Sequence, residues 1–317
     1  MEKIESSALK TILLSKRANI YYLEKCRVMQ KDGRIVYLTE GKKENLYWNI
    51  PIANTTTLLL GTGTSITQAA VRDLAGAGVM IGFCGGGGTP LLAGTEIAWL
   101  SPQSEYRPTQ YVQDWLAFWY DDAKRLAAAK KFQEERYAFL GKVWGKDRDL
   151  AAYGFYSDDL EAIAPAFHSQ IKESSNVSQL LNIKARLTKA LYKHAAQITG
   201  TENFTRCHED GDRANRLLDH GNYLAYGLAA TALWGLGIPH GFAVMHGKTR
   251  RGALVFDVAD LVKDAIILPF AFTSAKEGKT DQEFRALCLE KFAAYGALDF
   301  MFDTIKKVSA QGKGAGC

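Results

Sequence analysis

The segment Asp212-Arg-Ala-Asn215-Arg-Leu-Leu-Asp-His-Gly-Asn222-Tyr-Leu-Ala-Tyr226-Gly has its apolar residues at the spacing of one helix face. The same periodicity continues from this segment to Leu236. It returns in further stretches of the chain, at residues 111–143, 179–198, 261–268 and 282–307. The sequence therefore predicts that the chain is helical from about residue 108 onward.

The first ninety residues have a different character. β-Branched and aromatic residues form short runs separated by turn signals, and these runs predict strands at 18–23, 34–38, 55–60 and 79–83. One short helix is predicted at 66–74, capped by Thr64 or Ser65. The fold class is thus predicted as α+β: a small N-terminal β domain at 1–90, a linker at 91–106, and a larger all-helical catalytic domain at 107–317.

A glycine pair, Gly61-Thr-Gly63, stands between a predicted strand and this helix and suggests a dinucleotide-binding fingerprint. The third glycine of that fingerprint would fall at Ile66, and no acidic residue follows the next strand to bind a ribose. The pair is better interpreted as a tight turn that folds a helix onto a sheet.

The composition is that of a globular protein in a reducing compartment. The chain is 47% hydrophobic and 23% charged, and its net charge of +5 is compatible with nucleic acid without requiring it. The cysteines are odd in number, scattered, and never in a CxxC pair, which disfavours a zinc ribbon or a disulfide framework. No apolar run reaches the length of a membrane helix and no signal pattern opens the chain, so we expect a cytoplasmic protein without a membrane partner.

Residues 240–260 concentrate imidazoles, carboxylates and cations: His240-Gly-Phe-Ala-Val-Met-His246-Gly-Lys-Thr-Arg-Arg-Gly-Ala-Leu-Val-Phe-Asp257-Val-Ala-Asp260. If Asp257 opens a helical turn, Asp260 shares its helix face. With His246 returning from the preceding loop, they would form a mixed nitrogen and oxygen site that suits Mg²⁺ or Mn²⁺. Three cations would line the path of a polyanion, which favours phosphodiester chemistry: Lys248, Arg250 and Arg251.

Plainer interpretations of these residues stay open. Asp257 could be an N-cap that accepts the first free amide hydrogens of a helix, and each cation could be a solvated surface charge. His240 is interpreted as a structural or surface histidine. In a further predicted helix, interleaved glutamates favour an ordinary exposed helix over a second DNA face, although its cations are many: Lys124, Arg125, Lys130, Lys131 and Arg136.

Three blocks of the helical half, at 180–192, 212–227 and 237–260, together resemble the CRISPR-associated Cas1 family of spacer-acquisition endonucleases and integrases. Two blocks of the N-terminal half, at 14–26 and 61–71, agree with the β domain of that family. The resemblance spans nearly the whole chain and points to the type I, subtype F branch.

The resemblance implies a homodimer that binds double-stranded or branched DNA and a Cas2 partner, which in subtype F is fused to the Cas3 helicase-nuclease. It implies Mg²⁺ or Mn²⁺ held by one Glu, one His and one or two Asp. In the family reaction, the 3′-hydroxyl of a new spacer attacks a phosphodiester at a repeat boundary. His246, Asp257 and Asp260 match the family's histidine and acidic pair, while Asn215 and Tyr226 match the helix before them.

The family's catalytic Glu is not matched, because Lys184 stands at its position. An ammonium offers three donors and no acceptor, and its charge would compete with a metal for the same carboxylates. The chain could be an inactivated variant, a product of natural drift, or a case in which the register shifts and another acid serves, Glu173 being the nearest upstream. The plain interpretation is a solvated lysine on a basic helix surface beside Arg186, Lys189 and Lys193.

Two hypotheses follow from different classes. In the first, the chain is a metal-dependent DNA endonuclease and integrase. In the second, it is a catalytically impaired scaffold that still dimerises, binds DNA and organises its partner. Lys184 favours the second for this sequence.

Overall fold

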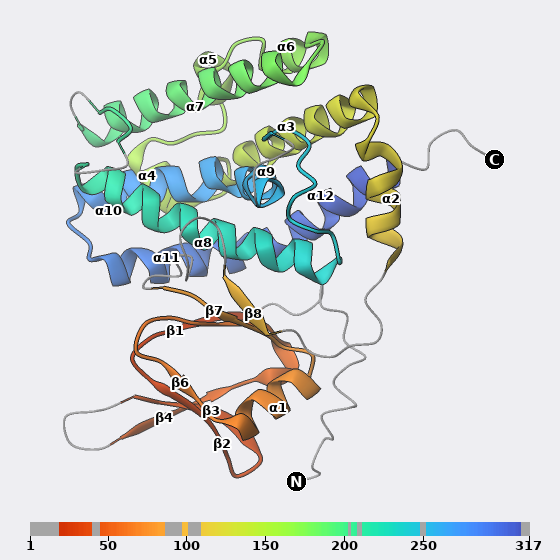
Figure 1. The fold of residues 1–317 in the computed structure, drawn as a ribbon. Coiled ribbons are helices and arrows are strands. Elements are labelled where there is room, and N and C mark those ends of the chain that lie inside the picture. The colour runs from red at the N-terminus through yellow and green to blue at the C-terminus, as the bar shows by residue number, and fades with distance from the viewer. Residues whose placement is uncertain are drawn as a thin grey trace. The chain divides into compact units, whose positions relative to one another are not determined.

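The computed structural model describes residues 19–39, 45–85, 97–100, 109–201, 204–207, 211–247 and 252–311. The chain divides into two compact units, Met1–Arg107 and Pro108–Cys317. The first is built mainly from strands and the second from helices, which confirms the predicted α+β class (Figure 1). Within the predicted linker, residues 98–100 form a strand. None of the described helices is both long and apolar enough to cross a membrane.

The described part of the N-terminal unit forms two four-stranded sheets. The first has the order β1-β5-β7-β8, with β1, β5 and β7 parallel and β8 antiparallel. Its strands are β1 (Asn19–Leu23), β5 (Thr55–Leu60), β7 (Met80–Phe83) and β8 (Ala98–Leu100). The second has the order β4-β3-β2-β6, and its strands are β2 (Arg27–Lys31), β3 (Arg34–Thr39), β4 (Leu46–Ile50) and β6 (Ser65–Ile66).

Turn chemistry sets the register of the second sheet. Lys31 pairs with Arg34 across a two-residue turn. Both turn residues have positive φ, 51° at Asp32 and 74° at Gly33, which is the turn type that matches the twist of a hairpin. The turn predicted at Lys31-Asp-Gly is therefore confirmed, although strands β2 and β4 were not predicted.

The core of this unit forms between the sheets and helix α1 (Gln68–Gly76). Strand β5 is buried along its whole length, as expected for an inner strand of a parallel arrangement. The N-cap of α1 is Thr67, whose side chain accepts a hydrogen bond from the backbone N–H of Ala70. The prediction of Thr64 or Ser65 as the cap is wrong because Ser65 belongs to β6, which pairs with β2.

The glycine turn at 61–63 is structural, as the sequence indicated. A Cβ on Gly61 would lie 2.4 Å from the Tyr22 hydroxyl, so any other residue here would require the Tyr22 ring to shift. Gly63 has φ of +73°, which favours glycine.

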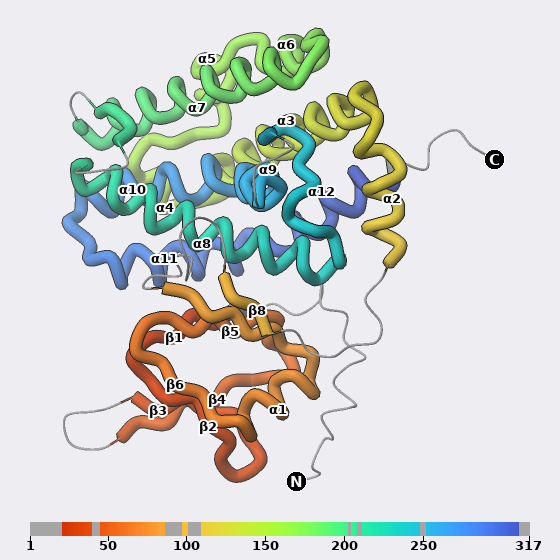
Figure 2. Tube along the Cα trace, viewed as in Figure 1, coloured from red at the N-terminus to blue at the C-terminus, as the bar shows by residue number. Residues whose placement is uncertain are grey.

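The described part of the C-terminal unit is built from eleven helices and one π-helical turn. The first group is α2 (Thr109–Trp119), α3 (Asp122–Trp144), α4 (Arg148–Tyr153), α5 (Asp159–Ile163), α6 (Phe167–Glu173) and α7 (Val177–Thr199). The second group is α8 (Arg213–Gly235), α9 (Ala253–Val262), α10 (Leu268–Lys276), α11 (Asp281–Ala294) and α12 (Ala297–Gln311). Helices α6 and α7 pack on each other and on α3 (Figure 2).

Local sequence fixes the ends of the two long helices that carry site residues. Asn176 caps α7, and Gly200, with φ of 70°, ends it in the left-handed conformation that glycine adopts without strain. Asp212 caps α8 by accepting from the backbone N–H of Asn215 at 2.8 Å. Both helices agree closely with the segments predicted at 179–198 and 212–236.

Two predicted helical segments are interrupted. The segment 111–143 breaks between α2 and α3, where Asp121 accepts from two backbone N–H groups and starts a new helix. The segment 282–307 breaks between α11 and α12, where Gly296 has φ of 61°. In each case the apolar face continues across the break, so periodicity alone did not reveal it.

Helix α9 lies in the interior of the helical unit, against α3, α8 and α12 (Figure 1). Nearly all of its residues are buried. It passes directly into the π-helical turn Lys263–Ile267 and then into α10. Pro269 follows this turn, and because proline lacks an N–H and crowds the preceding turn, regular helical bonding does not continue there.

A buried carboxylate holds α4 and α11 together. Asp147 caps α4 through the N–H groups of Asp149 and Leu150, and it accepts from Lys291 Nζ and the Tyr295 hydroxyl, each at 2.8 Å. Burial alone would raise the pKa of Asp147, but these hydrogen bonds and the Lys291 charge lower it below its ordinary value. Asp147 therefore stabilises the fold fully above the unfolded pKa of about 3.9, and this stabilisation is lost as the pH falls through the folded value.

We expect Asp147→Asn to lower the free energy of unfolding by about 3 kcal/mol at pH 7, because it leaves the buried Lys291 with only the exposed Asp149 as a charged partner. The variant should also lose less stability than the unmodified chain on acidification below about pH 4. Urea unfolding at pH 7 and pH 3 measures both. Asp149→Asn is the matched control, since the Asp149 side chain is 70% exposed and pairs with the same lysine. Equal losses in the two variants at pH 7 would contradict the expected role of Asp147.

Candidate functional site

The loop before α9 is held against the helix by Asp257. One oxygen of Asp257 accepts from the backbone N–H groups of Val244 at 2.8 Å and Met245 at 3.0 Å. The other accepts from the backbone N–H of His246 at 3.2 Å. Asp257 is completely buried, so these donors replace the water that its carboxylate loses.

The imidazole of His246 is oriented by the same carboxylate. Its Nδ1 lies 2.6 Å from Asp257 Oδ1, and its Nε2 lies 3.1 Å from Lys184 Nζ. The ammonium can only donate, so Nε2 is the acceptor and Nδ1 carries the proton that Asp257 accepts. Nε2 of His246 therefore faces position 184.

Lys184 belongs to α7, and its side chain reaches the site from that helix. Besides His246 Nε2, its ammonium forms an ion pair with Asp260 Oδ2. The Lys184 side chain is only 15% exposed. The interpretation of Lys184 as a solvated surface lysine is thus wrong. Lys184 links His246 Nε2 to Asp260, and Asp257 contacts the other ring nitrogen of His246.

Two more cations complete the buried charges around the site. Lys263 Nζ, at the start of the π-helical turn, lies 2.8 Å from Asp260 Oδ1 near the end of α9. Arg136 of α3 donates through Nε to Asp264 at 2.8 Å and through Nη2 to the Thr188 hydroxyl at 2.8 Å. We call the group of Arg136, Lys184, Asp257, Asp260, Lys263 and Asp264 the Lys184 cluster. Lys184, Asp260, Lys263, Asp264 and Arg136 line one cavity of about 170 Å³.

The charges of this cluster act on one another. Burial would raise the pKa of Asp260, but the positive charges of Lys184, Lys263 and Arg136 hold it well below its ordinary value. For Lys184, burial lowers the pKa, Arg136 and Lys263 lower it further, and Asp260 opposes them. Asp260 therefore stays ionised and remains the partner of Lys184 across the neutral pH range.

The donor set does not fit a divalent cation as these side chains stand. Asp257 already accepts from three backbone N–H groups and from His246 Nδ1. Of the remaining ligating atoms, His246 Nε2 and Asp260 Oδ2 contact the Lys184 ammonium, and Asp260 Oδ1 accepts from Lys263 Nζ. Among the residues that the structure describes, no group of three or more His, Cys, Asp or Glu side chains could hold a metal ion.

The other predicted site residues have separate environments. Asn215 is buried and its amide bonds the backbone of Thr205 and Cys207, so it holds the segment before α8. Tyr226 lies nearer the site, with Lys263 Nζ 5.2 Å from its ring and Phe256 packed edge-on against it. The three cations predicted to contact DNA lie outside the described residues: Lys248, Arg250 and Arg251.

Two alternatives from the sequence are wrong. Asp257 is not an N-cap, because α9 begins four residues earlier, at Ala253, and Asp257 lies in its buried interior. Arg136 is not part of an ordinary exposed helix, since it is 2% exposed and paired with Asp264. The rescue of the missing Glu by Glu173 finds no support, because Glu173 is an exposed residue at the end of α6.

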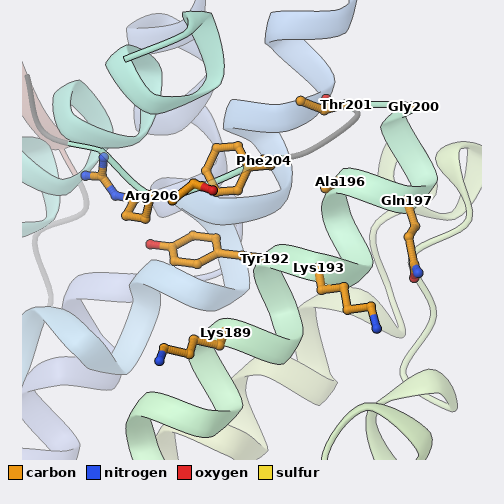
Figure 3. A pocket seen from close by; sticks show the side chains of 10 residues that line it. Lys189, Tyr192, Lys193, Ala196, Gln197, Gly200, Thr201, Phe204 and Arg206 are labelled. Carbon is orange, nitrogen blue, oxygen red and sulfur yellow. The ribbon is translucent and has the colours of Figure 1, made fainter. Parts of the chain in front are cut away.

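A second, larger cavity of about 680 Å³ lies further along α7 (Figure 3). Its apolar surface comes from Tyr192 and Phe204, whose rings are 5.5 Å apart. Lys189 and Lys193 lie along its rim and are exposed. Arg206 on the opposite side is paired with Asp219. The residues of this cavity that the structure describes include cations and no carboxylate.

The family described as "CRISPR associated protein Cas1" matches residues 20–287. The chain belongs to the Cas1 family. The CRISPR-associated endonuclease Cas1 of Pseudomonas aeruginosa (strain UCBPP-PA14) is 57% identical to it, over 98% of each chain. The Cas1 endonuclease of Pectobacterium atrosepticum is 54% identical, over 96% of each. These relatives confirm the resemblance and fit its subtype F character.

Solved structures support the Cas1 fold. A Cas1 protein from Thermotoga maritima has a TM-score of 0.68 at 16% identity, covering 93% of this chain and 97% of its own. TtCas1 in a complex with DNA has a TM-score of 0.64 at 22% identity, covering 94% and 92%. At these identities the likeness supports the fold alone.

Proposed function

We propose that this Cas1 chain serves CRISPR adaptation as a DNA-binding scaffold whose own catalytic centre is impaired. The observation that carries the proposal is the Lys184 ammonium, which contacts both His246 Nε2 and Asp260 Oδ2. In the family reaction, Mg²⁺ or Mn²⁺ stabilises charge on the phosphoryl group during spacer insertion by transesterification. Lys184 removes one carboxylate ligand and adds a cation, so we infer weak metal binding and slow cleavage or integration.

DNA binding does not depend on that centre. A relative of the same fold is described as a complex with DNA, and this chain carries a net charge of +5. The cavity along α7 offers aromatic rings with Lys189 and Lys193 at its rim, a combination that accepts bases and phosphates. We therefore propose Lys189 and Lys193 as phosphate contacts, in addition to the predicted Lys248, Arg250 and Arg251.

The partners are proposed from family membership and from the β unit. Strand β4 lies at the edge of its sheet, and three neighbouring residues on it, Leu46, Tyr47 and Trp48, are 50%, 47% and 50% exposed. Exposed apolar edges of this kind mark interaction surfaces, which supports a homodimer. A Cas2 domain, fused to Cas3 as in subtype F, is proposed as the further partner. The cytoplasmic location stays a prediction.

The test measures binding and integration on the same branched DNA, with the partner protein present. The unmodified chain should bind the DNA, yet its half-site integration in Mn²⁺ should not exceed that of the His246→Ala variant. Integration well above that variant would contradict an impaired centre.

The DNA contacts are tested by Lys189→Ala with Lys193→Ala. This double variant should weaken binding and reduce the slope of log K against log salt by about 1 to 2, since each phosphate contact contributes about 0.9. Lys124→Ala with Lys146→Ala is the matched control, because both are exposed lysines near the ends of α3. An equal loss in both double variants would contradict a specific role for the α7 cavity.

A further inference from the structure

The buried charges of the Lys184 cluster cancel. The cluster holds three cations, Arg136, Lys184 and Lys263, and three carboxylates, Asp257, Asp260 and Asp264. Its carboxylates are 0%, 5% and 6% exposed, so an excess charge here would meet little water. A neutral total is the least costly arrangement in such a setting.

The balance depends on residue 184. A glutamate at this position would leave two cations against four carboxylates, an excess of two negative charges. One divalent cation neutralises that excess. With Lys184 the net charge of the cluster is already zero without a metal ion, since the change from Glu to Lys raises the charge by two.

The position of the ammonium agrees with this exchange. Lys184 Nζ lies 3.1 Å from His246 Nε2, and it also contacts Asp260 Oδ2. The orientation of the imidazole by Asp257 is the arrangement by which a carboxylate directs the free nitrogen of a histidine toward a bound cation. Here that nitrogen is directed toward an ammonium.

We propose that Lys184 is a built-in replacement for the divalent cation, so that this site assembles and stays stable without any metal. The inference rests on the proposed impaired centre and deepens it by naming what took the metal's place. It predicts a protein whose stability is indifferent to divalent cations and to chelators, whereas a carboxylate at 184 would make stability depend on them.

Thermal unfolding of the full chain in EDTA and in rising MnCl₂, without DNA, tests this. The melting temperature of the unmodified chain should be the same in both. Lys184→Glu should melt lower in EDTA and rise by about 5–10 °C when Mn²⁺ reaches about a hundredfold excess over its Kd. Lys189→Glu is the matched control, because it makes the same charge change at an exposed position of α7 and should show no Mn²⁺ response.

A second variant keeps the test decisive if Lys184→Glu does not fold. Lys184→Gln removes the ammonium while adding no charge, and it should melt below the unmodified chain in EDTA. An unchanged melting temperature in Lys184→Gln would overturn the proposal, as would a rise of the unmodified chain in Mn²⁺. Because the assay contains no DNA, these results are independent of whether the chain binds or integrates DNA.

Discussion

Lys184→Glu should increase half-site DNA integration in Mn²⁺ by about a hundredfold or more over the unmodified chain, given that changes even behind a metal ligand alter affinity or activity by ten- to a hundredfold. The substitution restores a carboxylate at the family position. It also frees His246 Nε2 and Asp260 Oδ2 from the ammonium that contacts them. Quantification of integration product on a labelled repeat substrate, with the partner present, measures the gain.

Two controls separate a restored centre from other effects. Lys184→Gln removes the ammonium without adding a ligand and should gain little. The double variant of Lys184→Glu with His246→Ala should lose the gain, because His246 contributes the free imidazole nitrogen of the site. High activity of the unmodified chain that disappears in His246→Ala would contradict the impaired-centre proposal.

Arg136→Met should destabilise the protein by about 3–5 kcal/mol, which is the cost of leaving one partner of a buried ion pair alone. Arg136 and Asp264 are 2% and 6% exposed. The guanidinium also bonds Gln133 on its own helix and Thr188 on α7. Its loss therefore leaves Asp264 as an uncompensated charge and releases the helix that carries Lys184.

Chemical unfolding measures this loss of stability. Two comparison variants show whether the loss comes from the Arg136–Asp264 ion pair. Adding Asp264→Asn to Arg136→Met should recover part of the stability, because it removes the unpaired charge. Arg125→Met on the same helix should cost only about 1 kcal/mol, since its partner Asp122 is 79% exposed and solvent screens that pair. Equal losses at the two arginines would contradict the role of the Arg136–Asp264 pair.

Much of the fold could be predicted because individual capping and turn residues determine where helices and strands begin and end. The caps Asn176, Asp212 and Gly200 and the positive-φ turn at Asp32 and Gly33 mark where elements begin and end. The break at Asp121 was not predicted, because the apolar face of α2 continues into α3. The spacing of apolar residues does not show that the chain changes direction between two helices. The short strand β6 and the helices α4 to α6 were missed for lack of length.

The site could be predicted only in part. Lys184 and His246 are 62 residues apart, and the resemblance to Cas1 joined them where spacing could not. The helix face shared by Asp260, Lys263 and Asp264 was predictable from the sequence, because these residues are three and four positions apart. Arg136 was not, because its partner Asp264 lies 128 residues away and only packing brings α3 against the π-helical turn.

Titration of the purified chain with Mn²⁺ by isothermal calorimetry, beside Lys184→Glu, tests the central claim most directly. If the Lys184 ammonium stands in the place of the metal, the unmodified chain should bind no Mn²⁺ at this site, and Lys184→Glu should bind one ion. Binding of one Mn²⁺ by the unmodified chain that is lost in both His246→Ala and Asp260→Ala would contradict it.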